Sequence, residues 1–193
     1  MALVTVKPTT FDKRVAKSIS KQTGPRLETT AKTLTWGADE HLLLAASAMV
    51  WLASRRSDKK TRQAATHCLT TMVAVSILPH ALKTLVDQER PDREPFAQHR
   101  RGIPRSGKPK DAFPSGHAMH MGAFASFATL MPRRFRYSAW AAASVLMATR
   151  VVLLAHWVTD VAAGFVTGVA VERIVRLWTR PRPIMRKHRR TSV

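Results

Sequence analysis

Five apolar stretches separated by basic segments place the strongest constraint on how this chain folds. They lie at residues 36–53, 64–86, between Pro114 and Pro132, 137–154 and 156–178. None is an unbroken apolar run of the length that identifies a membrane span from hydropathy alone. Hydrophobic residues make up 45% of the chain while its mean hydropathy is only −0.14, so apolar residues gather in helices and charges between them. We therefore expect an all-α bundle of about five helices.

Two features favour a membrane-embedded bundle over a soluble one. Tryptophans stand at the ends of the first and fifth stretches: Trp36, Trp51, Trp157 and Trp178. The 21-residue separation in the fifth stretch spans about 31 Å of helix, close to the hydrocarbon thickness of a bilayer, whose interfaces tryptophan prefers. Gly164 and Gly168 make a small-xxx-small face that permits close helix contact in lipid. A soluble helical bundle is the alternative.

The chain divides by charge and hydropathy into three parts: a basic N-terminal segment, residues 1–35; a helical domain, residues 36–178; and a basic C-terminal tail, residues 179–193. In the first part, apolar residues recur at every fourth position from Phe11 to Ile19, with basic residues between them. That pattern describes a short amphipathic helix on an anionic membrane surface. A solvated tail is the alternative.

The net charge of +20 favours binding to polyanions such as anionic lipid headgroups, phosphorylated substrates or nucleic acid. Its basic residues are spread over every loop and both tails, without interleaved aromatic residues or a known nucleic-acid-binding signature. A nucleic-acid-binding protein is thus the disfavoured alternative, and we expect no nucleic-acid partner. Cys68 is the single cysteine, which excludes an intrachain disulfide and a cysteine-rich metal site.

The first of three clusters of chemically active residues stands where the second helix gives way to a long loop, residues 87–113. Lys83 and Arg90 are seven residues apart, so they share one face if the helix continues that far before Pro91. Two such cations repel each other unless an anion lies between them. The alternative is an ordinary surface pair of Lys83 with Asp87, four residues further on.

The second cluster, Pro114-Ser115-Gly116-His117, opens the third helix. A helix N-terminus offers free N–H groups and the positive end of the helix dipole, which suit a phosphate group. Ser115 can cap the helix, and Gly116 lets the backbone approach an oxyanion closely. His117 then faces the same anion from the first turn. Taken alone, Ser-Gly before a helix is a common cap.

Arg150, His156 and Asp160 form the third cluster, at the junction of the fourth and fifth helices. His156 and Asp160 are four residues apart, so Asp160 can accept the Nδ1–H of His156 and leave Nε2 free as a nucleophile. Because the third and fourth helices form one down-and-back pair, we expect all three clusters at one level of the bundle. There they gather three cations, two histidines and one carboxylate, which suits phosphoryl transfer.

These clusters resemble the motifs of the type-2 phosphatidic acid phosphatase (PAP2) family, which shares its core with vanadium haloperoxidases and bacterial acid phosphatases. The family patterns are KxxxxxxRP, PSGH and SRxxxxxHxxxD. The ten fixed residues that match them in order are Lys83, Arg90, Pro91, Pro114, Ser115, Gly116, His117, Arg150, His156 and Asp160. The single departure is Thr149 in place of serine, which keeps the hydroxyl group.

The resemblance implies a mechanism. His156 attacks phosphorus to form a phosphohistidine, Asp160 orients it, and His117 protonates the departing oxygen. The residues expected to hold the phosphate are Lys83, Arg90, Ser115, Gly116 and Arg150. No cofactor and no metal are expected, because the three cations supply the charge that magnesium supplies elsewhere. A soluble acid phosphatase or a vanadate haloperoxidase is the alternative within the same superfamily.

The expected substrate is a lipid phosphate, carried as a monoester or diphosphate on a polyprenyl-linked lipid or a glycerophospholipid. The short, Ala/Arg-rich chain favours a small bacterial member in a cytoplasmic (inner) membrane with anionic lipids, and we favour polyprenyl-linked substrates. With five spans, fourteen basic residues lie on each side of the membrane, so the positive-inside rule assigns no orientation.

Overall fold

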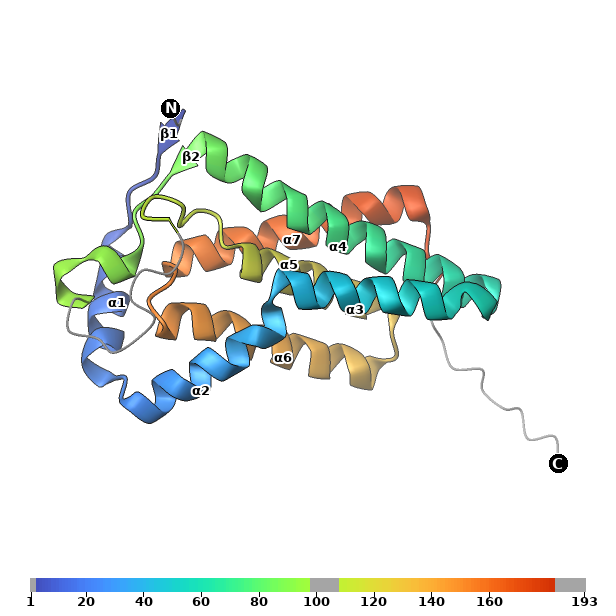
Figure 1. Cartoon of the computed structure of the whole chain (residues 1–193), viewed down its shortest axis with the longest axis horizontal. Helices are drawn as coiled ribbons and strands as arrows, with labels where there is room; N and C mark the ends of the chain where they lie inside the picture. The colour runs from blue at the N-terminus through green and yellow to red at the C-terminus, as the bar shows by residue number, and fades with distance from the viewer. Residues whose placement is uncertain (1–2, 98–107, 183–193) are drawn as a thin grey trace.

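The computed structural model describes residues 3–97 and 108–182, in which seven α-helices form a bundle with very little sheet (Figure 1). The α-helices are α1 Thr10–Gln22, α2 Pro25–Thr35, α3 Glu40–Ala53, α4 Lys59–Leu85, α5 Gly116–Phe127, α6 Arg133–Val152 and α7 Val158–Thr179. Short 3-10 helices accompany them: η1 Trp36–Ala38, η2 Ser54–Arg56, η3 Pro91–Arg93, η4 Pro95–Ala97 and η5 Ala128–Leu130. The five predicted helices are α3 to α7, so the all-α fold is confirmed.

Four of the predicted helix starts were wrong by two to five residues, because hydropathy marks apolar residues and not the residue at which a helix begins. The start of α3 is at Glu40 instead of residue 36, and that of α6 is at Arg133 instead of residue 137. The start of α4 is at Lys59 instead of residue 64, since the side chain of Asp58 accepts a hydrogen bond from the Thr61 N–H at 3.2 Å. The start of α7 is at Val158 instead of residue 156. Hydropathy marks the buried part of a helix, and the caps lie beyond it.

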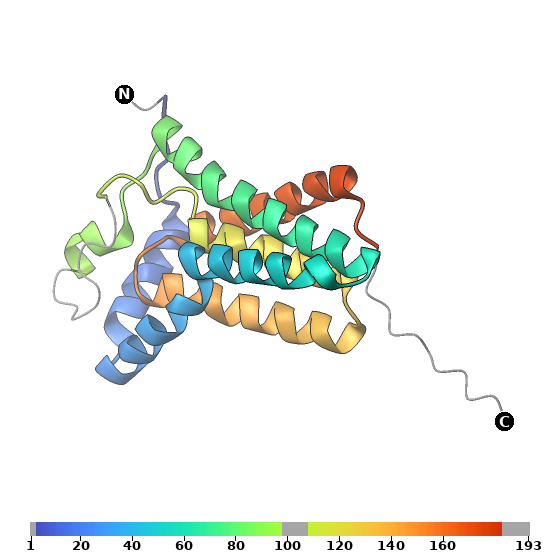
Figure 2. The same ribbon diagram turned by 45° about the vertical axis from the view of Figure 1, so that its right-hand side comes forward.

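The central helix is α5, which packs against α3, α4, α6 and α7 and is buried over most of its length (Figure 2). Its contact with α7 brings backbone against backbone. A Cβ atom placed on Gly168 would lie 1.9 Å from the carbonyl oxygen of Met119, and one on Gly122 would lie 2.1 Å from that of Phe165. The small residues predicted to allow close helix contact therefore do so here.

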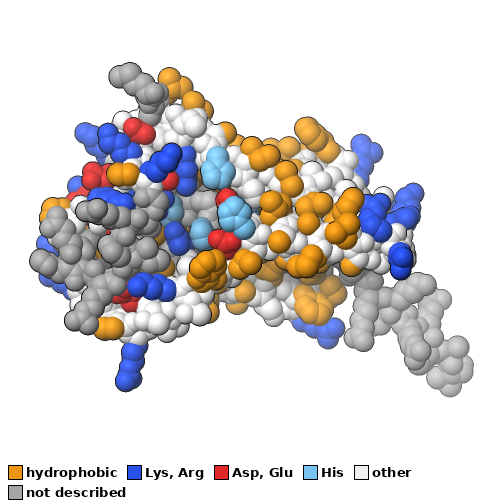
Figure 3. Space-filling model, viewed as in Figure 1, with side chains coloured by type: hydrophobic (Ala, Val, Ile, Leu, Met, Phe, Trp, Pro, Cys, Tyr) orange, Lys and Arg blue, Asp and Glu red, His pale blue; other side chains and the backbone are white. Residues whose placement is uncertain are grey.

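The flanks of the bundle carry many exposed apolar side chains. Large hydrophobic residues that are more than half exposed include Leu42, Met49, Val50, Leu52, Ile77, Val145, Val166, Ile174 and Leu177. Figure 3 shows one face of the molecule, on which patches of hydrophobic side chains lie beside a group of histidine and acidic side chains, with basic side chains toward both ends. Exposed apolar side chains in this number favour a contact with lipid or with another protein. Among the described residues, α4 alone has the length and composition to cross a membrane.

The tryptophans do not all take the positions that the sequence predicted. Trp36 and Trp178 are 63% and 82% exposed, as expected of residues at a membrane interface. Trp157 is buried, and its indole N–H donates a hydrogen bond to the carbonyl oxygen of Glu89 at 2.7 Å. The interfacial position expected for Trp157 was therefore wrong, because this residue packs inside the protein.

The N-terminal segment folds onto the end of the bundle where the three clusters lie. A helix was expected over Phe11 to Ile19 as one of two interpretations, and α1 occupies that range, while α2 was not predicted. Ile19 packs against a buried apolar cluster centred on Trp157. Ahead of α1, β1 (Val4–Thr5) pairs in parallel with β2 (Val86–Asp87), which follows α4. Most of the predicted C-terminal tail, residues 183–193, lies outside the described residues.

Candidate active site

The three predicted clusters meet at one end of the bundle, held by hydrogen bonds between segments far apart in sequence. The backbone N–H of Ser115, at the start of α5, donates to the carbonyl oxygen of Asp160 in α7 at 3.2 Å. The guanidinium of Arg90, in the long loop, donates to the carbonyl oxygen of Ala155 at 2.8 Å. Each bond joins residues of two different motifs, so the relative position of the motifs is fixed by the fold.

Lys83 and Arg90 do not share a helical face, because α4 ends at Leu85 and the chain continues as an extended strand. They approach each other through Asp111 instead. Its carboxylate lies 2.8 Å from Arg90 Nη2 and 3.8 Å from Lys83 Nζ. The expectation of an anion between the two cations is met by a residue that the sequence did not single out. Asp87, the alternative partner, lies in β2.

The ring of His156 is oriented by a backbone carbonyl group. Its Nδ1 lies 2.7 Å from the carbonyl oxygen of Ala112, which accepts hydrogen bonds but cannot donate one, so Nδ1 carries the proton. Asp160 Oδ2 is 3.8 Å from the same nitrogen and instead accepts from the Trp157 N–H at 2.9 Å. The predicted Asp160–His156 hydrogen bond was therefore wrong, whereas the predicted tautomer, with Nε2 unprotonated, follows from Ala112.

His156 is 3% exposed, and this burial favours its neutral form. Burial, followed by the nearby guanidinium groups of Arg90 and Arg150, lowers the pKa of His156 well below its ordinary value, although the Ala112 hydrogen bond acts in the opposite direction. The imidazole is consequently neutral at pH 7. A neutral ring with a free Nε2 lone pair is the form that can act as a nucleophile.

The turn between α6 and α7 holds His156 in place. Arg150 closes α6, and its carbonyl oxygen accepts from the backbone N–H groups of both Ala155 and His156. Leu154 adopts a left-handed conformation with φ of 53°, which costs a non-glycine residue of the order of 1 kcal/mol. The carbonyl oxygen of Leu154 is in turn bound by the N–H of Asp92 at 3.1 Å. The hydrogen bond from Asp92 and the turn between α6 and α7 together fix the position of His156.

The N-terminus of α5 lies where the sequence predicted it, in the Pro114–His117 cluster. Ser115 is buried and caps the helix, with its Oγ accepting from the Ala118 N–H at 3.4 Å. Gly116 opens the helix and carries no side chain of its own. His117 follows in the first turn and is half-buried. Arg150 and Lys83 lie within electrostatic range of His117, so cations converge on this helix start.

The N-terminus of α7 differs from that of α5, because a carboxylate from α1 binds its N–H groups. Asp12 is 1% exposed, and its two oxygens accept hydrogen bonds from the N–H and hydroxyl of Thr159 at 3.0 and 2.8 Å. The same carboxylate accepts from the N–H and hydroxyl of Thr9 and so caps α1 as well. Asp12 thereby fixes the helix turn that follows His156. The sequence shows only the local signal, a Thr-x-x-Asp capping box.

These hydrogen bonds keep Asp12 ionised. Burial acts to raise the pKa of Asp12, but the hydrogen bonds from Thr9 and Thr159 outweigh it and leave the pKa below its ordinary value of 3.8. The stabilising contribution of Asp12 is therefore present above about pH 4 and is lost as the pH falls through the lowered pKa.

Replacing Asp12 with asparagine is expected to weaken both the fold and the site. Asparagine offers one acceptor oxygen and turns an NH₂ group toward the Thr9 and Thr159 donors, so the free energy of unfolding should fall by about 1–3 kcal/mol. The apparent Tm of the detergent-purified protein measures this loss. Asp58→Asn is the matched control, because Asp58 is the exposed N-cap of α4 and asparagine caps equally well. An equal Tm for the two variants would contradict the assigned role of Asp12.

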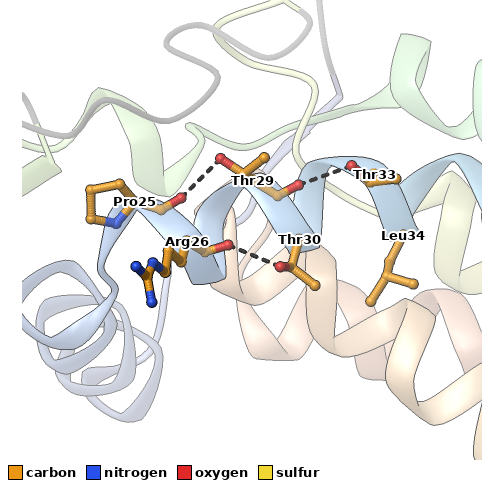
Figure 4. Close-up of a pocket in the computed structure, with 6 residues that line it drawn as sticks. All are labelled: Pro25, Arg26, Thr29, Thr30, Thr33 and Leu34. Atoms are coloured by element: carbon orange, nitrogen blue, oxygen red, sulfur yellow. Dashed lines mark hydrogen bonds between the residues drawn. The ribbon is translucent and has the colours of Figure 1, made fainter.

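Two hollows lie near the N-terminal helices, and they differ in chemistry. One, of about 310 Å³, is lined by Lys32, Thr35, Trp36, Asp39 and His117 and thus adjoins the α5 N-terminus. The other, of about 650 Å³, is lined by α2 residues (Figure 4). There the hydroxyl groups of Thr29, Thr30 and Thr33 each donate to a carbonyl oxygen of their own helix. The smaller hollow is therefore the one that bears on the site.

Fold and site together define a helical bundle with a buried histidine and a cluster of cations at one end. The chain belongs to the PAP2 superfamily, whose family model matches residues 64–184. That span contains all three clusters described above, whereas α1, α2 and α3 precede it.

Relatives of known name agree with this membership. The chain is 39% identical over 108 residues to a lipid A 1-phosphatase of Rhizobium etli, a match that covers 53% of this chain and 44% of the relative. The lipid A 1-phosphatase of Rhizobium johnstonii is 36% identical over 108 residues, which cover 51% of this chain and 41% of that protein. The matched region thus spans less than half the length of either relative.

Two solved structures share the fold. The PAP2-type phosphatidylglycerolphosphate phosphatase from Bacillus subtilis aligns with a TM-score of 0.66 and 20% identity, over 92% of this chain and 88% of that one. LpxE from Aquifex aeolicus aligns with a TM-score of 0.63 and 14% identity, over 91% and 98% of the two chains. At these identities the likeness establishes the arrangement of the helices.

Proposed function

We propose that this chain is a membrane-embedded lipid phosphatase that works through a phosphohistidine at His156. The observation that carries the proposal is the orientation of His156. Because Ala112 fixes the Nδ1 proton, Nε2 presents a lone pair among the cations that would bind the phosphate. Membership in the PAP2 superfamily and the names of the relatives support the reaction class.

In the proposed first step, His156 Nε2 forms a bond to phosphorus while the bond from phosphorus to the lipid oxygen breaks. His117 gives its proton to that departing oxygen. In the second step, His117 takes a proton from a water molecule, whose oxygen displaces the histidine and releases inorganic phosphate. Lys83, Arg90 and Arg150 would balance the charge on the phosphate oxygens in both steps. Asp160 would serve by capping α7 beside His156.

The apolar flanks support the membrane part of the proposal. The bundle of α3 to α7 would lie in the bilayer as a unit, with the exposed Trp36 and Trp178 at opposite interfaces. A bacterial inner membrane suits the relatives, which come from Rhizobium species. The substrate would then reach the site from the lipid phase, as a monoester or a diphosphate.

Phosphate release by the detergent-purified protein is expected to persist in the presence of EDTA. The three cations would carry the charge that a divalent metal carries elsewhere, so chelation should leave the rate unchanged within about twofold. The measurement is inorganic phosphate released from phosphatidic acid, a polyprenyl phosphate and lipid A in mixed micelles, with and without EDTA. A rate that disappears with EDTA and returns with magnesium would contradict metal independence. Release from none of these lipids would remove the proposed function itself.

A further inference from the structure

We propose that a cationic hollow at the end of the bundle remote from His156 binds the phosphate of an anionic phospholipid headgroup. The hollow has a volume of about 470 Å³ and lies where η2, the start of α4 and the end of α7 meet. Its lining residues are Arg55, Lys59, Arg62, Gln63, Thr66 and Thr179. The inference goes beyond the proposed reaction and rests only on the membrane part of the proposed function.

The three cations of the hollow lack acidic partners. Within residues 3–97 and 108–182, Arg55, Lys59 and Arg62 form no ion pair with an aspartate or glutamate. Asp58 is the single acidic residue between positions 54 and 66, and its carboxylate caps α4 by accepting from the Thr61 N–H at 3.2 Å. Positive charges that face one hollow repel each other, and an anion bound between them relieves that repulsion.

The hollow offers N–H and O–H donors of the kind that a phosphate accepts. Arginine can present two N–H groups to one phosphate, and lysine adds a mobile point charge. Arg55 is held in place, because its guanidinium lies 4.6 Å from the centre of the Trp51 ring. The side chains of Gln63 and Thr66 make no hydrogen bond within the part of the chain that the structure describes, so they remain available to a headgroup.

A buried polar network joins the two long helices that line the hollow. The Thr179 hydroxyl donates to the carbonyl oxygen of Val175 at 2.9 Å and lies 2.8 Å from Nδ1 of His67, in α4. His67 is itself buried, and its Nε2 lies 2.8 Å from Glu172 Oε1, in α7. The start of α4 and the end of α7 are therefore held in a fixed relative position on either side of the hollow.

The hollow lies at the level where a lipid headgroup is expected. Trp51 and Trp178 stand near the ends of α3 and α7, and tryptophan prefers the interface between membrane and water. The side chains of Leu52 and Leu177, at the same end, are exposed. A lipid could thus place its phosphate among the cations and its acyl chains against these apolar side chains, whereas a free anion would use the cations alone.

The lining distinguishes this hollow from the active site. Among the described residues, those that line it include no histidine, aspartate or glutamate, so it offers neither the nucleophile nor the proton donor of the proposed reaction. A lipid bound there would be held and not hydrolysed. The basic side chains toward this end of the molecule are visible in Figure 3.

The test is the apparent Tm of the full, detergent-purified chain in neutral micelles that contain increasing amounts of phosphatidylglycerol. A ligand that binds the folded state raises the Tm. Phosphatidylglycerol carries its phosphate as a diester, which the proposed reaction on monoesters and diphosphates does not consume. Phosphatidylcholine supplies the same acyl chains without net charge, and inorganic phosphate supplies an anion without a lipid. The Tm should rise with phosphatidylglycerol and stay nearly constant with phosphatidylcholine.

Two double variants locate the bound lipid. Arg55→Gln with Arg62→Gln removes two of the three cations. At about fivefold in affinity per cation, the phosphatidylglycerol content that gives half of the Tm shift should rise by about 25-fold. Arg133→Gln with Arg134→Gln is the matched control, because both residues start α6 at the same end of the bundle and their guanidinium groups lie over aromatic rings of α6 itself. The control should change by less than about threefold.

The outcomes separate the lipid site from the proposed function. An equal change in the two double variants would overturn the site, because the attraction would then belong to the whole basic surface. A Tm unaffected by phosphatidylglycerol would overturn it too. If inorganic phosphate gave an equal shift that Arg55→Gln with Arg62→Gln abolished, the assignment to a lipid would be wrong. Phosphate release in neutral micelles should be equal in the wild type and both variants, and its absence from all three would remove the proposed function without affecting the Tm result.

Discussion

Replacing His156 with asparagine is expected to reduce phosphate release by at least about 10³-fold, because the residue proposed to attack phosphorus is lost. Asparagine keeps an N–H donor that can reach the Ala112 carbonyl oxygen, so the turn before α7 should retain its shape. The measurement is the rate of phosphate release from a radiolabelled lipid phosphate at saturating substrate, together with the apparent Tm of the variant.

The covalent intermediate provides the second arm of this experiment. Acid-labile, base-stable label should accumulate on the wild-type protein after rapid quenching and be absent from His156→Asn. His41→Ala is the matched control, since the His41 side chain is 85% exposed and lies 3.8 Å from Glu40. Full activity in His156→Asn, or label retained on it, would assign the nucleophile to another residue.

Replacing Gly168 with alanine is expected to lower the free energy of unfolding by about 3 kcal/mol, toward the upper end of the range for overpacking. The new Cβ would lie 1.9 Å from the Met119 carbonyl oxygen and 2.9 Å from the Ala123 nitrogen, both of which are backbone atoms of α5. Neither can rotate away, so α5 and α7 must separate. For a chain of 193 residues this corresponds to a fall in Tm of roughly 6–12 °C.

Gly24→Ala is the matched control for this change. A Cβ on Gly24, the residue before α2, meets no atom within 4 Å, so its Tm should stay close to that of the wild type. Gly164→Ala adds a readout at the site, because its Cβ would lie 2.4 Å from the carbonyl oxygen of Ser115. A Tm of Gly168→Ala equal to that of Gly24→Ala would mean that the two helices lie further apart than described.

The sequence predicted those parts of the molecule that depend on local pattern. Apolar stretches located α3 to α7, and motif spacing identified three groups of residues that the fold brings together. Gly164 and Gly168 were predicted to allow close helix packing, and they do. Helix α2 was missed because its apolar residues are few and largely exposed, so no periodic pattern reports it.

Contacts between segments far apart in the chain could not be predicted from the sequence. Asp12 meets Thr159 at a sequence separation of 147 residues, and Asp111 meets Arg90 at a separation of 21 residues. Each looks like an ordinary capping or loop carboxylate until the chain is folded. The His156 partner was mistaken for a related reason. Helical spacing placed Asp160 beside it, but a helix that starts at Val158 leaves His156 outside that spacing.

The two helix starts at this end of the bundle have opposite consequences for turnover. That of α7 is occupied by the carboxylates of Asp12 and Asp160, which leaves the start of α5 as the place where the proposed mechanism would hold an incoming oxyanion. Electrostatic attraction of this kind does not distinguish a phosphate ester from the free phosphate that remains after hydrolysis. If the cations bind the substrate phosphate as proposed, they would also retain the product. Escape of inorganic phosphate would then compete with chemistry as the slow step, and a high phosphate concentration would lower the rate.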